Sequence, residues 1–235
     1  MRVRLFAVLL GMVFAGVAVA APPAPPAPAV PLPYVEGTDY FLIDPPQRSG
    51  VDGKVEVTEV FSYGCPACNF AYPYFEKIRK GLPANAVMTY VPASFKPNEA
   101  WPMFQRAYLA AQALGIADKA HTAMFDAIWK DKTLSIMNPD GRTIKSPLPT
   151  IEDAAKFYAK FGVKAEDFVA TANSFAISTK MKQADAYVRA TGVDATPTIV
   201  VAGKYRLNYQ SAGGDWDKMG TLINYLVRKE SVEQK

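Results

Sequence analysis

The strongest constraint on the fold is a pair of cysteines placed where a strand meets a helix. Residues 55–62 are rich in β-branched and aromatic side chains and predict a strand that runs directly into Cys65-Pro66-Ala67-Cys68. Residues 66–80 carry apolar side chains at helical spacing, and residues 87–91 predict a second strand. The apolar positions of this helix are Phe70, Tyr74 and Ile78. A strand, a helix and a strand in this order predict two parallel strands joined by a right-handed crossover.

The chain beyond this unit changes to helical patterns. Helices are expected at 100–114, 119–129, 151–161, 166–171 and 175–191. Strand signals return at 198–202 and 205–207, with Gly203-Lys204 as the turn of a hairpin. A last helix is expected at 215–228, with Asp215 as its N-cap. Together with a short strand at 40–43, these patterns predict an α/β fold interrupted by an all-helical insertion.

The N-terminal region predicts an exported protein. Residues 1–20 have a charged start, an apolar run and Ala18-Val19-Ala20, which is the pattern of a cleavable signal peptide. An uncleaved anchor or a buried helix is the alternative, although the run is short for a membrane span of roughly 20 residues. Residues 21–33 contain seven prolines and four alanines, which predicts an extended leader that serves as a spacer. The α/β domain is then expected at 34–96 and 188–235, and the helical insertion at 97–187.

Composition excludes several classes of function. Arg2 and Arg4 lie in the signal peptide, and the other 24 of the 26 Lys and Arg nearly balance the 22 Asp and Glu. The mature chain therefore gives no basis for nucleic-acid binding. Two cysteines and one histidine, His121, cannot supply a four-thiolate or histidine-rich metal site, so no metal and no organic cofactor is expected. His121 itself is expected to be a surface or half-buried residue of a helix.

The position of the cysteines indicates redox chemistry. Pro66 favours the first helical turn, which places Cys65 at or beside the N-cap. There the helix dipole and the unpaired N–H groups stabilise a thiolate. Cys68 lies one turn further along the helix, close enough to form a disulfide. We therefore expect Cys65 to be the exchanging sulfur and Cys68 to be the resolving thiol.

Other uses of the pair are open but weaker. A structural disulfide between these residues would close a very short loop and constrain little of the unfolded chain. Half of a zinc site would lack its remaining ligands, and haem attachment needs a histidine where Asn69 stands. A peptide-binding chaperone with a structural disulfide is therefore the alternative function from a different class.

The stretch Val57-Thr58-Glu59-Val60-Phe61-Ser62-Tyr63-Gly64-Cys65-Pro66-Ala67-Cys68 resembles the active site of DsbA-type thiol:disulfide oxidoreductases. Thr196-Pro197 resembles the cis-proline loop of the thioredoxin fold, and the helical insertion matches the architecture of the family. The resemblance covers nearly all of the mature chain and implies a thioredoxin fold interrupted by an all-helical insertion domain. It also implies a periplasmic enzyme that donates its disulfide to newly exported proteins with free thiols. A DsbB-type membrane quinone-linked oxidase would then reoxidise it.

The resemblance also assigns roles to residues outside the cysteine pair. Pro197 is expected in cis beside the cysteines, with Thr196 near Cys65 and the loop open to an extended substrate peptide. An ordinary trans proline is the alternative. Glu59 is expected to be a partly buried acid that relays the proton of Cys68, because by alternation it lies on an apolar face of its strand. An exposed acid in another register is the alternative.

One position departs from the family pattern. Ala67 stands where the familiar motif has a histidine that helps to hold the thiolate of the nucleophile. Since Ala67 adds neither charge nor hydrogen bond, a reductase or isomerase of the same fold is the nearest rival. Residues 21–40 are too short and too rich in proline for the dimerisation domain of a DsbC-type isomerase, and a monomer is expected. Phe61 and Tyr63 are expected to pack around the site.

Overall fold

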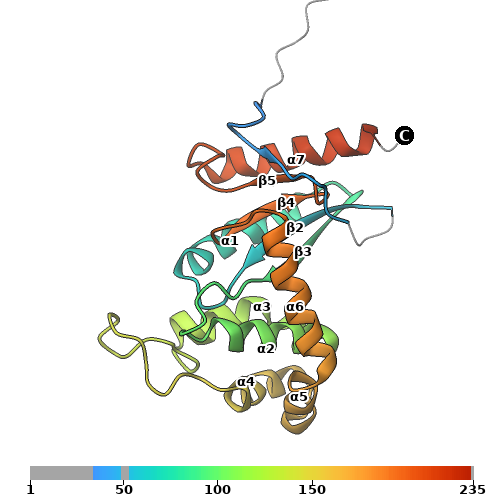
Figure 1. The fold of residues 1–235 in the computed structure, drawn as a ribbon. Coiled ribbons are helices and arrows are strands. Elements are labelled where there is room, and N and C mark those ends of the chain that lie inside the picture. The colour runs from blue at the N-terminus through green and yellow to red at the C-terminus, as the bar shows by residue number, and fades with distance from the viewer. Residues whose placement is uncertain (1–33, 49–52, 234–235) are drawn as a thin grey trace, which may run out of the picture. The chain divides into compact units, whose positions relative to one another are not determined.

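A five-stranded mixed sheet forms the centre of the computed structural model, which describes residues 34–48 and 53–233. The expected signal peptide and leader lie outside these residues. The strand order is β1-β5-β4-β2-β3, with β2 and β3 parallel and the other neighbours antiparallel (Figure 1). The strands are β1 (Phe41–Leu42), β2 (Val55–Phe61), β3 (Ala86–Pro92), β4 (Thr198–Val201) and β5 (Tyr205–Leu207). The predicted parallel pair and the hairpin are therefore both present.

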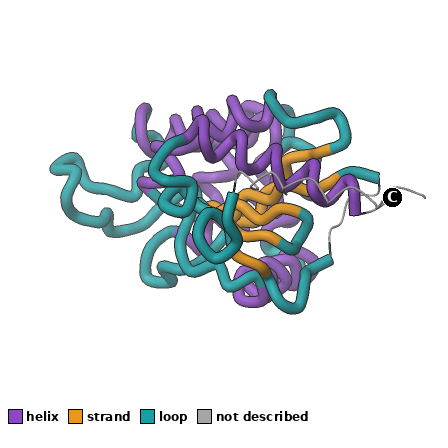
Figure 2. Tube along the Cα trace, turned by 90° about the horizontal axis from the view of Figure 1, so that it is seen from above, coloured by secondary structure: helices purple, strands orange, loops and turns teal. Residues whose placement is uncertain are grey.

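Helices cover both faces of the sheet (Figure 2). Helices α1 (Pro66–Lys80) and α7 (Trp216–Glu233) share one hydrophobic core with the strand residues Val57 and Val201. Val60 and Val200 point to the opposite face, because side chains alternate along a strand, and they pack with Val188 of α6 (Phe175–Ala190). Oxygen Oδ1 of Asp215 accepts hydrogen bonds from the N–H groups of Asp217 and Lys218, which confirms it as the cap of α7.

The insertion between β3 and β4 consists of helices, as predicted. Besides α6 they are α2 (Trp101–Ala113), α3 (Ala117–Phe125), the π-helical turn η1 (Asp126–Lys130), α4 (Ile151–Tyr158), the 3₁₀ turn η2 (Ala159–Phe161) and α5 (Ala165–Ala172). Thr150 and Asp153 form a capping box that starts α4. The insertion has an aromatic core, in which Trp101, Phe104, Tyr108 and Phe125 are buried and Trp129 is half-buried.

The boundaries of the two domains stay a prediction. Helix α6 runs from Phe175 to Ala190 without a break, so it passes through the expected boundary at 187. Its last turns pack against the sheet through Val188.

Among the described residues, none of the helices combines the length and the apolar character needed to cross a bilayer.

The apolar stripe of α1 differs from the one read from the sequence. Ile78 is buried as expected, but Phe70 is 65% exposed and Tyr74 is 37% exposed. The buried positions are Cys68, Ala71, Phe75 and Ile78. The two stripes share Ile78 and otherwise lie one residue apart, and the buried one packs in a common core with α7, where the ring of Phe75 meets Trp216 edge-on at 5.6 Å. The ring of Tyr74 instead stacks on Trp216 at 4.8 Å.

The hairpin after β4 depends on a glycine. Gly203 has a φ of +66°, and a Cβ at this position would overlap the carbonyl oxygen of Gln47. Gly141 has the same φ but no atom within 4 Å of such a Cβ. We expect Gly141→Ala to destabilise the protein by about 1 kcal/mol through backbone strain alone. Gly203→Ala should destabilise it by about 3 kcal/mol or more, because steric overlap adds to the strain. Urea unfolding of both variants measures the difference, and equal losses would contradict this account.

Candidate active site

Cys65 caps the N-terminus of α1. Strand β2 ends at Phe61, and a tight turn follows in which the N–H of Cys65 donates to the carbonyl of Ser62 at 3.1 Å. Helix α1 begins at Pro66, which has no N–H to leave unpaired. The Sγ of Cys65 accepts a hydrogen bond from the N–H of Cys68 at 3.4 Å. The sulfur therefore occupies the position of a capping side chain at the positive end of the helix dipole.

The two sulfurs have different pKa values because their environments differ. A hydrogen bond from the Cys68 side chain, with further ones from Thr196 and the N–H groups of Cys68 and Ala67, lowers the pKa of Cys65 to about 6 against the opposing effect of burial. Burial raises the pKa of Cys68, and the nearby sulfur of Cys65 raises it further. Cys65 is 5% exposed and Cys68 is fully buried. Near neutral pH, Cys65 is thus mainly a thiolate and Cys68 a protonated thiol.

The loop before β4 reaches the cysteines. The Thr196–Pro197 peptide bond is cis, and the carbonyl oxygen of Thr196 lies 3.5 Å from the Sγ of Cys65. Thr198 stabilises this loop, since its hydroxyl donates to the carbonyl of Ala195 at 2.8 Å. Residues 131 positions apart in the sequence therefore meet at one sulfur.

Glu59 lies beneath the cysteines inside the sheet. It is 1% exposed, which excludes the alternative of an exposed strand acid, and its oxygen Oε1 has no hydrogen-bond partner in the described part of the chain. Burial, together with the smaller effects of the charges of Glu76 and Cys65, raises the pKa of Glu59 to about 8. Its charge in turn contributes to the raised pKa of Cys68. At neutral pH the carboxyl is therefore largely protonated and can supply a proton to a neighbouring sulfur.

The expectation for His121 was wrong. His121 is 6% exposed, and its Nδ1 forms a 3.0 Å hydrogen bond with the hydroxyl of Tyr63. Burial lowers the pKa of His121 to about 4, so the ring is neutral near pH 7. Its position four residues before Phe125 on the buried face of α3 was the sequence signal that could have placed it in the core. Phe61 and Tyr63 pack around the site as expected, with ring centroids 5.0 Å apart.

Within residues 34–48 and 53–233, no group of three or more His, Cys, Asp or Glu residues comes together in a way that could hold an ion.

Comparison with known proteins agrees with this geometry. Residues 51–224 match a family model described as thioredoxin. The thiol:disulfide interchange protein DsbA of Pseudomonas aeruginosa is 34% identical over 202 residues, which are 86% of this chain and 88% of that protein. DsbA of Azotobacter vinelandii is 30% identical over 226 residues, which are 96% and 98% of the two chains. The chain belongs to the DsbA family.

Solved DsbA structures share the fold. A variant of Pseudomonas aeruginosa DsbA has 34% identity and a TM-score of 0.73, covering 85% of this chain and 99% of that one. The DsbA oxidoreductase of Xylella fastidiosa has 34% identity and a TM-score of 0.73, covering 84% and 98%. The protein is therefore a thiol:disulfide oxidoreductase with a thioredoxin fold and a helical insertion, as the resemblance implied.

The thiol of Cys65 should titrate near pH 6. The rate of alkylation of the reduced protein by iodoacetamide should rise with a midpoint at about 6, because only the thiolate reacts. Cys68 should stay unmodified over the same range because it is buried. Cys65→Ser is the control and should remove the low-pH reaction. A midpoint near the ordinary pKa of a thiol would contradict the described environment of Cys65.

Ionisation of Glu59 should destabilise the folded protein. Its folded pKa of about 8 lies above its ordinary value, so the associated stability is fully present below the ordinary pKa and is lost as the pH rises through 8. We expect Glu59→Gln to gain a few kcal/mol relative to the unsubstituted protein between pH 5 and pH 8, at ~1.4 kcal/mol for each pH unit. Urea unfolding of the oxidised proteins avoids titration of the thiols. A difference independent of pH would show that Glu59 does not titrate in this range.

Proposed function

We propose that the protein is a periplasmic dithiol oxidase that donates its Cys65–Cys68 disulfide to exported proteins with free thiols. The observation that carries this proposal is the unequal setting of the two sulfurs, since the Sγ of Cys65 caps the N-terminus of α1 and Cys68 is fully buried. A stabilised thiolate at Cys65 favours the reduced form of the enzyme, so its disulfide is given away readily. A thiolate of low pKa is also the better leaving group, which directs exchange to Cys65.

The first step is attack on Cys65. A substrate thiolate forms a bond to the Sγ of Cys65, the Cys65–Cys68 bond breaks, and the electron pair passes to the sulfur of Cys68. This buried sulfur cannot remain charged, so it takes the proton of Glu59, and the carboxylate then regains a proton from water. The pKa values support this transfer, since Glu59 is largely protonated at neutral pH and the pKa of Cys68 is raised.

The second step releases the oxidised substrate. A second substrate thiolate attacks the substrate sulfur of the mixed disulfide, and Cys65 leaves with the electron pair as a thiolate. Two electrons have then moved from the substrate dithiol to the enzyme. Hydrogen bonds from Cys68, Thr196 and the backbone of Ala67 stabilise the released thiolate.

The cis-proline loop is the proposed binding site for substrate backbone. Thr196 and Pro197 lie against Cys65, at the end of a loop that leads into β4. An extended peptide that pairs with this loop would place its cysteine beside the Sγ of Cys65. The exposed ring of Phe70 on the first turns of α1 supplies apolar surface, which suits the unfolded chains that carry unpaired thiols.

The cellular setting follows from the N-terminal residues and the family. The signal-peptide pattern of residues 1–20 supports export to the periplasm, and the proline-rich composition of residues 21–33 supports a role as a spacer. We propose that the folded part acts as a monomer. Regeneration needs an oxidant, for which we propose a DsbB-type membrane quinone-linked oxidase. Electrons would pass from Cys65 and Cys68 to that partner by the same exchange in reverse.

A reductase is the second candidate, and Ala67 favours it. A histidine at this position would add a charge or hydrogen bond to the Cys65 thiolate, and Ala67 adds neither. The backbone and Cys68 contacts remain, so we expect an oxidising couple of reduced strength. Ala67→His should shift the glutathione equilibrium further toward the reduced enzyme.

Equilibration in glutathione buffers tests the direction of transfer. We expect the Cys65–Cys68 disulfide to be mostly reduced at glutathione ratios that leave ordinary protein disulfides intact. Cys68→Ala should accumulate mixed disulfides with reduced, unfolded substrate proteins through Cys65, and Cys65→Ala should accumulate none. An equilibrium close to that of a reducing thioredoxin would overturn the oxidase proposal in favour of the reductase. A disulfide that glutathione cannot reduce would identify a structural bond.

A further inference from the structure

The turn that delivers Cys65 has one carbonyl that the turn itself does not use. The hydrogen bond from the N–H of Cys65 to the carbonyl of Ser62 closes a four-residue β-turn whose central residues are Tyr63 and Gly64. The peptide between these central residues points across the turn. Its carbonyl direction differs by about 180° between type I and type II turns. A change in the orientation of the Tyr63 carbonyl therefore changes the dihedral angles of Tyr63 and Gly64, the two residues that lead into Cys65.

Local sequence leaves both orientations open. Type II needs a positive φ at the third residue of the turn, and glycine adopts it without steric penalty. Gly64 nevertheless lies outside the left-handed region. A Cβ at Gly64 would lie 3.0 Å from Cδ1 of Trp101, so this glycine is needed for close packing rather than for a positive φ. Within the turn, the N–H of Gly64, which belongs to the same peptide as the Tyr63 carbonyl, donates to Oγ of Ser62 at 3.2 Å.

Trp129 holds the carbonyl end of this peptide from the insertion. Its indole N–H donates to the carbonyl oxygen of Tyr63 at 2.9 Å. Reversal of the central peptide would break this bond and leave a buried carbonyl unpaired. Trp129 lies in the π-helical turn η1, in which the N–H of Asp131 donates to the carbonyl of Asp126 at 2.8 Å. This wider turn rotates Trp129 relative to its place in a continuous α-helix.

The side chain of Tyr63 is held from the same part of the fold. Its hydroxyl is 3.0 Å from Nδ1 of His121 on α3, and its ring is packed edge-on against Phe125 at 5.0 Å. Tyr63 is buried. Residues of the insertion therefore form hydrogen bonds with both the carbonyl and the hydroxyl of Tyr63. Tyr63 lies two positions before Cys65. We call Tyr63, His121 and Trp129 the Tyr63 anchor.

We propose that the Tyr63 anchor positions Cys65, so that the insertion domain sets the reactivity of the thiolate from outside the cysteine motif. The proposal deepens the oxidase function and rests on it. Tyr63, His121 and Trp129 are positioning residues, since they act on the sulfur only through the turn. With the turn fixed, the Sγ of Cys65 keeps the hydrogen bonds that it accepts from the N–H of Cys68 and from the Thr196 side chain. With the turn free, those contacts are present only part of the time.

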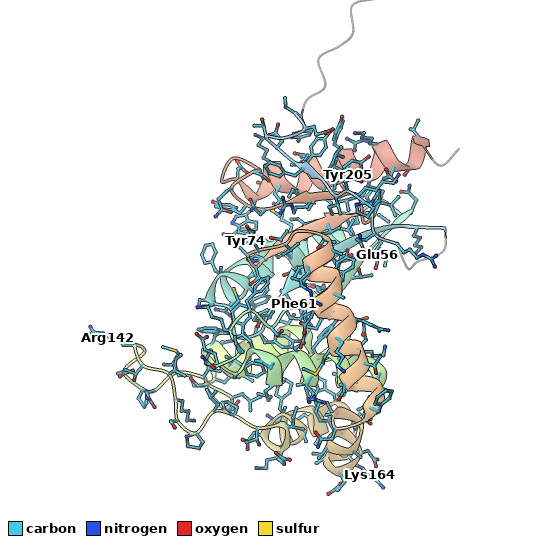
Figure 3. All side chains as sticks on the ribbon, in the orientation of Figure 1. Glu56, Phe61, Tyr74, Arg142, Lys164 and Tyr205 are labelled. Carbon is cyan, nitrogen blue, oxygen red and sulfur yellow. The ribbon has the colours of Figure 1, made fainter. Side chains whose placement is uncertain are left out.

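The test separates positioning from general stability. Trp129→Phe keeps an aromatic ring but removes the N–H, and Tyr63→Phe removes only the hydroxyl. Tyr205→Phe is the matched control, because the buried hydroxyl of Tyr205 donates to Oε1 of Glu230 at 3.0 Å. Figure 3 shows Tyr205 beside α7, well apart from Phe61, which lies against the insertion helices. For each protein we would measure the melting temperature, the pH titration of Cys65 by thiolate absorbance, and the equilibrium with glutathione.

We expect both anchor variants to raise the pKa of Cys65 and to shift the glutathione equilibrium roughly fivefold toward the disulfide, the factor that the loss of one hydrogen bond produces. Tyr205→Phe should lower the melting temperature by a similar amount and leave the titration and equilibrium within about twofold. Either anchor variant suffices if the other fails to fold. Lower stability with an unchanged titration and equilibrium would overturn the proposal. An unsubstituted protein that lacks a low-pH thiolate would overturn both this proposal and the oxidase function.

Discussion

The stabilisation of one sulfur at the start of a helix is the interaction on which the rest of the site depends. The Sγ of Cys65 takes the place of a capping oxygen and receives the N–H of Cys68, so the charge of the thiolate meets the positive end of α1. The N-terminus of α1 stays at this position because the buried side of the helix is fixed to the sheet. The buried Ala71, Phe75 and Ile78 hold α1 on the face that it shares with α7.

Burial then makes the two sulfurs chemically different. Three residues along the same helix, Cys68 is removed from water and surrounded by the insertion core, where a negative charge is poorly solvated. Glu59 lies in the same low-dielectric region and is kept protonated for the same reason. At neutral pH the site therefore has a proton on the buried carboxyl of Glu59 and a negative charge on the Sγ of Cys65. This arrangement suits a disulfide whose reduction needs a proton for the buried sulfur of Cys68 and leaves a thiolate on Cys65.

Ala67 shows that the thiolate is stabilised without a charged or polar side chain at this position. The side chain at this position contributes nothing polar, yet the pKa of Cys65 is lowered to about 6. Hydrogen bonds from Cys68, Thr196 and the N–H of Ala67 itself account for the shift. The strength of these hydrogen bonds depends on the position of the backbone around Cys65. The geometry of the turn before Cys65 therefore matters more for the pKa of this thiol than it would in a site with a charged neighbour.

The sequence by itself determined the β-α-β unit, the cysteines at its junction, the helical insertion and the acid on an apolar strand face. These follow from periodicity and from turn residues, which act over a few neighbouring positions. Tertiary structure decided the stripe of α1, which lies one residue from Phe70 and Tyr74 because α7 packs against Phe75. It also decided the hydrogen bond between His121 and Tyr63, which joins residues 58 positions apart. Contacts at such separations leave no periodic trace in the sequence, because they depend on how complete elements pack together.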